Sequence, residues 1–236
     1  MVPGLADWGT NNVPEAHAGT TACCLLSAAC QVPAPSVSLS WVQLLLASAS
    51  PRRAGLLTAA GFSFDVVPAD VDEQVRPDED PEAHVLRLAR AKVRAVRPVG
   101  HDSVILGADT VVVVDGEILG KPADDRHAAS MLRRLSGRSH EVLTGVVVRR
   151  GEREESGVER TSVRFLPLSD QEIARYISTG EASDKAGAYG AQGLASRFVE
   201  RIDGSYTNVV GLPVPLVCRL LEALGELPGW QGDEGG

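Results

Sequence analysis

The chain has 236 residues, of which 44% are hydrophobic and 23% charged, with a formal net charge of −8. This composition is typical of a globular protein with a large core, and no apolar run reaches the ~20 residues that a membrane-spanning helix needs. The acidic balance argues against a nucleic-acid polymer as partner, because such binders carry a basic face. The cysteines and histidines lack zinc-ligand spacing, which favours free thiols in a reducing cytoplasm.

The two ends of the chain differ in composition from the middle. Residues 1–42 contain neither Lys nor Arg and show no sustained period of 2 or 3.6. No positive segment precedes their short apolar stretch, so we expect a flexible N-terminal extension and no signal peptide. Residues 43–228 are predicted to form one folded domain, and the glycine-rich residues 229–236 a disordered tail.

The first half of the predicted domain alternates strands and helices. A buried strand at 44–47 leads into a helix from 51 to about 60, for which Ser50 is a favourable N-cap. A second strand at 64–67 is followed by the acidic loop ADVDEQVRPDED, and then by a helix from 81 to about 96. Val85, Leu88, Lys92 and Ala95 lie along one stripe of that helix.

Strands dominate the second half. We expect short strands at 104–106 and 111–114, broken at Gly107–Thr110, and a hairpin turn at 115–116. A helix at about 124–135 precedes two β runs at 141–149 and 159–166. A helix after Ser169, a glycine-rich passage at 184–193, a strand at 198–202 and a helix after Pro213 complete the pattern. Strands interleaved with helices and hairpins predict an α/β fold with a mixed sheet.

The junction LLLASASPRRAGLL, residues 44–57, is the first candidate site. A strand that ends in a small-residue turn before a capped helix directs free backbone N–H groups and the positive helix end to one point. Ser48 and Ser50 add hydroxyl groups, and Arg52 and Arg53 add planar guanidinium groups that bind phosphate oxygens. A capped surface helix with exposed arginines fits this stretch taken alone equally well.

Four further side chains fit either a functional role or an ordinary structural or surface role. Asp109, at the expected strand break, suits a metal ligand or proton acceptor, or an Asx-turn. Glu73 suits the same metal or a solvated loop. Lys92 interrupts an apolar stripe, so it either snorkels or points into a cleft. Lys121, between Gly120 and Pro122, suits phosphate or an ordinary loop. Together these residues suit a metal-chelated polyphosphate and an activated water.

The motifs together resemble the Maf nucleotide pyrophosphatases, also described as septum-formation inhibitor proteins. The similarity runs from about residue 44 to 224. Its motifs are ASASPRR (47–53), VDEQ (71–74), RLARAKVRA (87–95), GADTVVVVDGEILGKP (107–122), LSGRSHEVLTGV (135–146), DKAGAYGAQG (184–193) and GSYTNVVGLP (204–213).

The resemblance implies hydrolysis of a nucleoside triphosphate to the monophosphate and pyrophosphate with a divalent cation, Mg²⁺ or else Mn²⁺ or Co²⁺. It implies an elongated mixed sheet with two lobes and a central cleft, as in Maf and ITPase-like proteins, and a homodimer. Asp109 matches the family's proton acceptor. Other positions match its phosphate and metal residues: Ser48, Ser50, Arg53, Glu73, Lys92 and Lys121, with Glu73 and Asp109 as metal ligands.

Base preference is predicted from three further positions. Arg52, Thr110 and Gln192 match the subtype that prefers dTTP and UTP, whereas the subtype acting on 7-methyl-GTP carries Trp, Gln and Glu there. The resulting prediction is a cytoplasmic dTTP/UTP pyrophosphatase. A nucleotide-binding regulator of septum formation with incidental hydrolysis, and a hydrolase of nucleotide sugars, are the alternatives.

Overall fold

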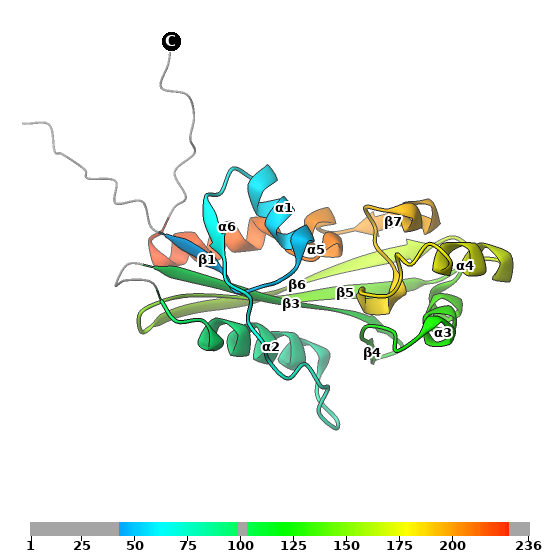
Figure 1. Cartoon of the computed structure of the whole chain (residues 1–236), viewed down its shortest axis with the longest axis horizontal. Helices are drawn as coiled ribbons and strands as arrows, with labels where there is room; N and C mark the ends of the chain where they lie inside the picture. The colour runs from blue at the N-terminus through cyan, green and yellow to red at the C-terminus, as the bar shows by residue number, and fades with distance from the viewer. Residues whose placement is uncertain (1–42, 99–102, 227–236) are drawn as a thin grey trace, which may run out of the picture. The chain divides into compact units, whose positions relative to one another are not determined.

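The computed structural model describes residues 43–98 and 103–226. In this part of the chain seven strands form one mixed sheet in the order β2-β1-β3-β5-β6-β7, with β4 paired to β3 (Figure 1). The strands are β1 (Leu44–Leu46), β2 (Phe64–Val66), β3 (Val104–Val114), β4 (Glu117–Leu119), β5 (Ser139–Arg150), β6 (Arg153–Phe165) and β7 (Val199–Asp203). The predicted α/β fold with a mixed sheet is confirmed.

Six α-helices and two short 3₁₀ turns occur in the same described residues. They are α1 (Pro51–Ala59), α2 (Pro81–Ala95), α3 (Asp125–Leu135), α4 (Asp170–Ile177), η1 (Ala186–Ala188), η2 (Leu194–Phe198), α5 (Tyr206–Val210) and α6 (Val214–Leu224). None of these helices is long and apolar enough to cross a membrane. The extension predicted at 1–42 and the tail predicted at 229–236 lie outside the described residues.

Strand β3 differs from the sequence prediction, because it continues through Gly107–Thr110 without a break. Residues 105–113 pair in unbroken antiparallel register with residues 149–141 of β5. The opposite edge of β3 is only partly covered, since its last pair with β1 is Leu46 with Leu106 and its first pair with β4 involves Val112. Residues 107–111 therefore have no strand partner on that edge in the described structure.

Helices cover both faces of the sheet. Helix α2 lies on one face, and α1, α5 and α6 lie on the other (Figure 1). Two glycines allow α2 to approach the strands closely: a Cβ atom on Gly107 would lie 2.6 Å from the Ala89 carbonyl oxygen, and one on Gly145 would lie 2.6 Å from the Val85 carbonyl. The side chains of Leu88, Lys92 and Val93 on α2 are buried, whereas Ala95 is exposed.

The core is divided along the long strands. One cluster packs α1 and α6 against residues such as Leu106 and Val146. A second cluster packs α3, α4 and the segment 182–198 against Val112 and Phe165. These two groups of packed elements match the predicted lobes. The open edge of β3 lies between its pairings with β1 and β4, which leaves room there for a cleft.

Candidate active site

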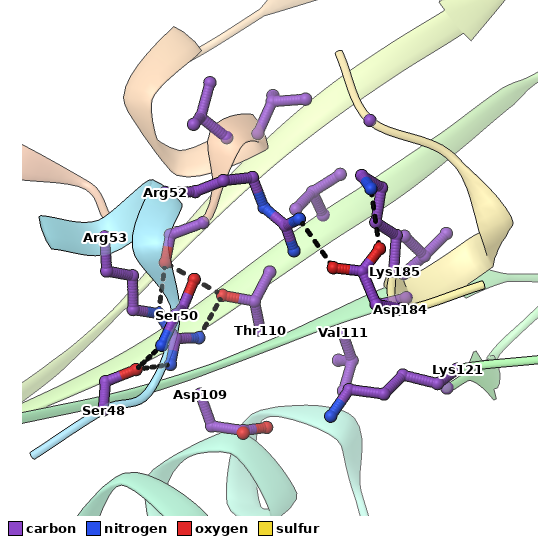
Figure 2. Close-up of a pocket in the computed structure, with 18 of the residues that line it drawn as sticks. Ser48, Ser50, Arg52, Arg53, Asp109, Thr110, Val111, Lys121, Asp184 and Lys185 are labelled. Atoms are coloured by element: carbon purple, nitrogen blue, oxygen red, sulfur yellow. Dashed lines mark hydrogen bonds and ion pairs between the residues drawn. The ribbon is translucent and has the colours of Figure 1, made fainter. Parts of the chain in front are cut away.

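A cleft of about 830 Å³ lies at this open edge of β3. Its walls come from the start of α1, the loop after β2, helix α2, β3 and the segment 181–193. Figure 2 shows Arg53 of α1, Asp109 of β3 and Lys185 of the segment 181–193 among the lining residues. All of the side chains predicted from the sequence line it: Ser48, Ser50, Arg52, Arg53, Glu73, Lys92, Asp109, Thr110, Lys121 and Gln192. The fold therefore brings together residues that are separated by up to 144 positions (192 − 48) in the chain.

Lys92 is the centre of a charged cluster in the cleft. Its Nζ atom lies 2.6 Å from Asp109 Oδ1 and 2.7 Å from Glu73 Oε1. Lys92 and Asp109 are buried, whereas Glu73 is partly exposed and also pairs with Lys121 at 3.3 Å. The ammonium group of Lys92 thus points into the cleft, and Asp109 projects from a continuous strand, not from an Asx-turn.

The two lysines keep Glu73 ionised. Burial raises the pKa of Glu73, but the hydrogen bond from Lys92 and the charges of Lys92 and Lys121 outweigh that effect, so its pKa is below the ordinary value. A negatively charged Glu73 is what binding of a divalent cation requires.

The donor set fits a divalent cation completed by a substrate. Oxygen atoms of Glu73 and Asp109 contact one and the same nitrogen atom, so the two carboxylates converge on a single point. Among the described residues, no group of three or more His, Cys, Asp or Glu side chains could hold a metal ion. Mg²⁺ is commonly held by one or two carboxylates together with substrate phosphate oxygens and water, which is the arrangement available here.

Arg53 is anchored by protein acceptors. Its Nε donates to the Gly211 carbonyl at 2.8 Å, Nη1 donates to the Ala108 carbonyl at 2.8 Å and to Ser48 Oγ at 3.2 Å, and Nη2 donates to Thr110 Oγ1 at 3.1 Å. These bonds use four of the five guanidinium N–H groups. Burial lowers the pKa of Arg53, and the charges of Asp109 and Glu73 oppose that effect. Arg53 therefore ties α1, β3 and the α5–α6 turn together and leaves one N–H group for a ligand.

Thr110 belongs to the network of Arg53. Adjacent residues of a strand face opposite sides of the sheet, and Figure 2 shows Thr110 and Asp109 on opposite sides of β3. The hydroxyl of Thr110 lies 2.9 Å from Thr144 Oγ1 and 3.2 Å from the Gly211 carbonyl oxygen, to which it donates in addition to accepting from Arg53.

The α1 wall meets the segment 181–193 through ion pairs. Arg52 Nη1 lies 3.2 Å from Asp184 Oδ2, and Lys185 Nζ lies 2.7 Å from Asp184 Oδ1 (Figure 2). The hydrogen bond from Lys185 outweighs burial and lowers the pKa of Asp184. Gln192 is exposed in the same segment, close along the chain to Gly190 and Gly193. Ser50 precedes α1, but its side chain makes no capping hydrogen bond, and its N–H group donates to Ser48 Oγ.

Comparison with known proteins identifies the family. The model of the Maf-like protein family matches residues 43–224. This chain belongs to the Maf-like family. Similar proteins named dTTP/UTP pyrophosphatase occur in Bacillus pumilus, 47% identical over 79% of this chain and 98% of that protein, and in Citrifermentans bemidjiense, 52% identical over 78% and 96%. A third, from Syntrophomonas wolfei, is 53% identical over 76% of this chain and 96% of its own length.

The structure of this Maf-like chain adds cleft residues to those predicted from the sequence. Glu181, Asp184, Lys185 and Tyr189 line the cleft, although sequence reasoning assigned them no role. The motif DKAGAYGAQG contains Asp184, Lys185 and Tyr189 and was the available signal. The Gly211 carbonyl that holds Arg53 has no such signal, because a backbone acceptor is independent of residue type.

Proposed function

We propose that this chain is a nucleoside triphosphate pyrophosphatase that hydrolyses dTTP and UTP to the monophosphate and pyrophosphate. The observation that carries the proposal is the convergence of Lys92, Asp109, Glu73 and Lys121 in the cleft at the open edge of β3. The names of relatives about half identical to the chain support the two substrates. We expect the enzyme in the cytoplasm. A homodimer stays a prediction.

The proposed chemistry is attack of water on the α-phosphorus. The new bond joins the water oxygen to the α-phosphorus, the bond from that phosphorus to the α–β bridging oxygen breaks, and pyrophosphate leaves. Asp109 accepts the proton of the attacking water, and Lys92 at 2.6 Å keeps its carboxylate oriented. A divalent cation held by Glu73 and Asp109 would neutralise phosphate charge when bound.

The cationic residues lower the barrier by balancing the charge of the phosphates and of the leaving group. Lys121 is exposed and pairs with Glu73 at 3.3 Å, so its ammonium group can move to contact the phosphates of a bound substrate. Arg53 is buried and preorganised, and it contributes its positive charge and one N–H group. Preorganised donors of this kind act without a reorganisation cost during the reaction. Arg52 and Gln192 lie in other parts of the cleft wall and are proposed to contact the base.

Asp109→Asn tests the catalytic assignment. We expect pyrophosphate release from dTTP to fall by at least roughly a hundredfold, because the amide cannot accept the proton. Asp115→Asn is the matched control, since Asp115 lies in the turn after the same strand and outside the cleft. Near-normal release by Asp109→Asn, with a normal melting temperature, would exclude Asp109 as proton acceptor.

A substrate panel tests the proposed preference. Pyrophosphate release is measured with dTTP, UTP, CTP, 5-methyl-UTP, pseudo-UTP and 7-methyl-GTP at equal concentrations. We expect the highest kcat/KM with dTTP and UTP. A higher value with 7-methyl-GTP would contradict the subtype assignment, and no pyrophosphate release from any of the six nucleotides would contradict the proposed function.

A further inference from the structure

The loop that carries Glu73 has no regular secondary structure. Residues 67–80 lie between β2 and α2, and residues 72–78 are exposed. Loops of this kind are more mobile than the elements they join. The Glu73 carboxylate nevertheless has to meet Lys92 and Asp109 at hydrogen-bond distances. Something outside the cleft must therefore hold the backbone of this loop.

Glu79 is a partly buried acceptor at the end of the loop. Its side chain is only 10% exposed, and its two oxygens accept from Arg87 Nε at 2.6 Å and from Arg87 Nη2 at 2.7 Å. The same carboxylate accepts from the Arg76 N–H group at 3.2 Å and contacts His84 Nδ1 at 2.9 Å. Such a bidentate pair fixes orientation as well as distance.

Arg87 also holds the loop next to Glu73. Its Nη2 atom donates to the Gln74 carbonyl oxygen at 3.0 Å. One guanidinium group on α2 thus binds the residue that follows Glu73 and the carboxylate at the end of the loop. Lys92 lies five positions further along the same helix, a rise of roughly 7.5 Å, and binds the Glu73 side chain. Backbone and side chain of this part of the loop are therefore both fixed from α2.

We propose that Glu79 and Arg87 are positioning residues that hold Glu73 beside Lys92 and Asp109 and so set the affinity for a divalent cation and nucleotide. This inference rests on the proposed function. His84 is buried between the Glu79–Arg87 pair and the cleft, since it contacts Glu79 and also lines the cleft. The hydrogen bonds from Arg87 outweigh burial and hold the pKa of Glu79 well below its ordinary value, so the pair is charged near neutral pH.

Glu79→Gln tests the proposal, because it keeps the shape of the side chain and removes its charge. The control is Glu154→Gln: Glu154 accepts from Arg90 Nε at 2.6 Å and ties α2 to β6, away from Glu73. Partners of metal ligands are typically worth roughly 10- to 100-fold in metal affinity or activity. We expect Glu79→Gln to raise the Mg²⁺ concentration for half-maximal dTTP hydrolysis about tenfold or more, and Glu154→Gln to leave it within about twofold.

A double-mutant cycle separates positioning from general destabilisation. The Kd of α,β-methylene-dTTP, which the enzyme cannot cleave, is measured in the presence of Mg²⁺ for Glu73→Gln, Glu79→Gln and both together. We expect Glu79→Gln to weaken binding about tenfold in the parent and less than about twofold when Glu73 is already replaced. An equal loss in both backgrounds would overturn the proposal.

Hydrogen exchange gives a readout that needs neither metal nor activity. In the metal-free protein, the Arg76 amide is bonded to Glu79, so a peptide covering residues 70–80 should exchange faster in Glu79→Gln than in Glu154→Gln. Unchanged exchange would overturn the proposal. If the parent protein releases no pyrophosphate from any nucleotide, the proposed function fails, and the exchange result still decides whether Glu79 and Arg87 hold the loop.

Discussion

The hydroxyl group of Thr110 is a hydrogen-bond acceptor for the buried guanidinium group of Arg53. Thr110 Oγ1 is the acceptor for Arg53 Nη2 at 3.1 Å and is itself held by Thr144 and the Gly211 carbonyl. The sequence assigned Thr110 to base selection. Its hydroxyl is occupied by the network around Arg53, so we expect Thr110 to act by holding Arg53 in place. This distinction leads to a prediction about selectivity.

Thr110→Val should lower kcat/KM for dTTP, UTP and CTP by a similar factor, about tenfold, because it leaves a buried donor of Arg53 without its acceptor. Thr110→Ser retains the hydroxyl group and should stay close to the parent. Steady-state kinetics with the three nucleotides provide the measurement. A change in the ratio between nucleotides, without a common loss, would show that Thr110 contacts the base.

At the scale of elements, the position of α2 decides the geometry of the cleft. This helix carries His84, Arg87 and Lys92, and it rests on β5 at Gly145, where a Cβ atom would lie 2.6 Å from the Val85 carbonyl carbon and oxygen. The neighbouring atoms belong to backbone, which cannot rotate away as a side chain can. Any added atom at this position must displace the helix or the strand.

Gly145→Ala should therefore destabilise the protein by about 1–3 kcal/mol and also reduce dTTP hydrolysis, since displacement of α2 moves Lys92. Gly55→Ala is the control: Gly55 lies in α1 with no atom within 4 Å of its would-be Cβ, and alanine there should stabilise by roughly 0.4–1 kcal/mol. Denaturant unfolding gives both values. Equal stability of the two variants would contradict the packing argument.

At the scale of the whole molecule, the core that packs around α3 and α4 contains a titratable group. His140 is buried against Phe165 and Tyr189, and its Nε2 lies 2.8 Å from the Tyr189 hydroxyl. Its Nδ1 has no hydrogen-bond partner within the described residues. Burial lowers the pKa of His140 from 6.5 to about 4. The folded protein thus keeps this ring neutral where the unfolded chain protonates it.

The sign of the pH effect follows from proton uptake. Between pH 6.5 and about 4 the unfolded chain binds a proton that the folded chain does not, so the free energy of unfolding should fall as pH falls, by on the order of 3 kcal/mol over that range. His140→Gln should flatten this part of the curve, as measured by urea unfolding at several pH values. Identical slopes in parent and variant would show that His140 is not the responsible group.

Local signals in the sequence predicted most elements but not the continuity of β3. Helix α4 begins after Ser169 with the reciprocal Ser169–Glu172 capping bonds, and α2 follows the cap Asp80. The small and polar residues 107–110 indicated a break in the strand, because their low strand propensity takes no account of the strands and helices that pack against them. Pairing with β5 and the close approach of α2 override that local preference.

The residues of the candidate site that lie in sequence motifs were predicted. The roles that depend on contacts between distant segments were not. The motifs named every predicted cleft residue from Ser48 to Gln192, and all of these line one cavity. They did not indicate that Glu79 and Arg87 hold the loop at residues 67–80. They also did not indicate that most N–H groups of Arg53 donate to acceptors of the protein itself. These roles depend on distances between segments that are remote in the chain.

The sequence by itself determined the family, the class of fold and the inventory of charged groups, because these depend on residue type and order. Only the tertiary structure decided which of these groups form hydrogen bonds and ion pairs with one another. Lys92 meets Asp109 and Glu73 because a glycine-lined contact brings α2 onto β3 and β5 beside an edge that β1 and β4 leave uncovered. Hydrogen bonds form only at heavy-atom distances of about 3 Å, and the energy between two charges falls as their distance grows, so the chemistry of this cleft depends on that packing.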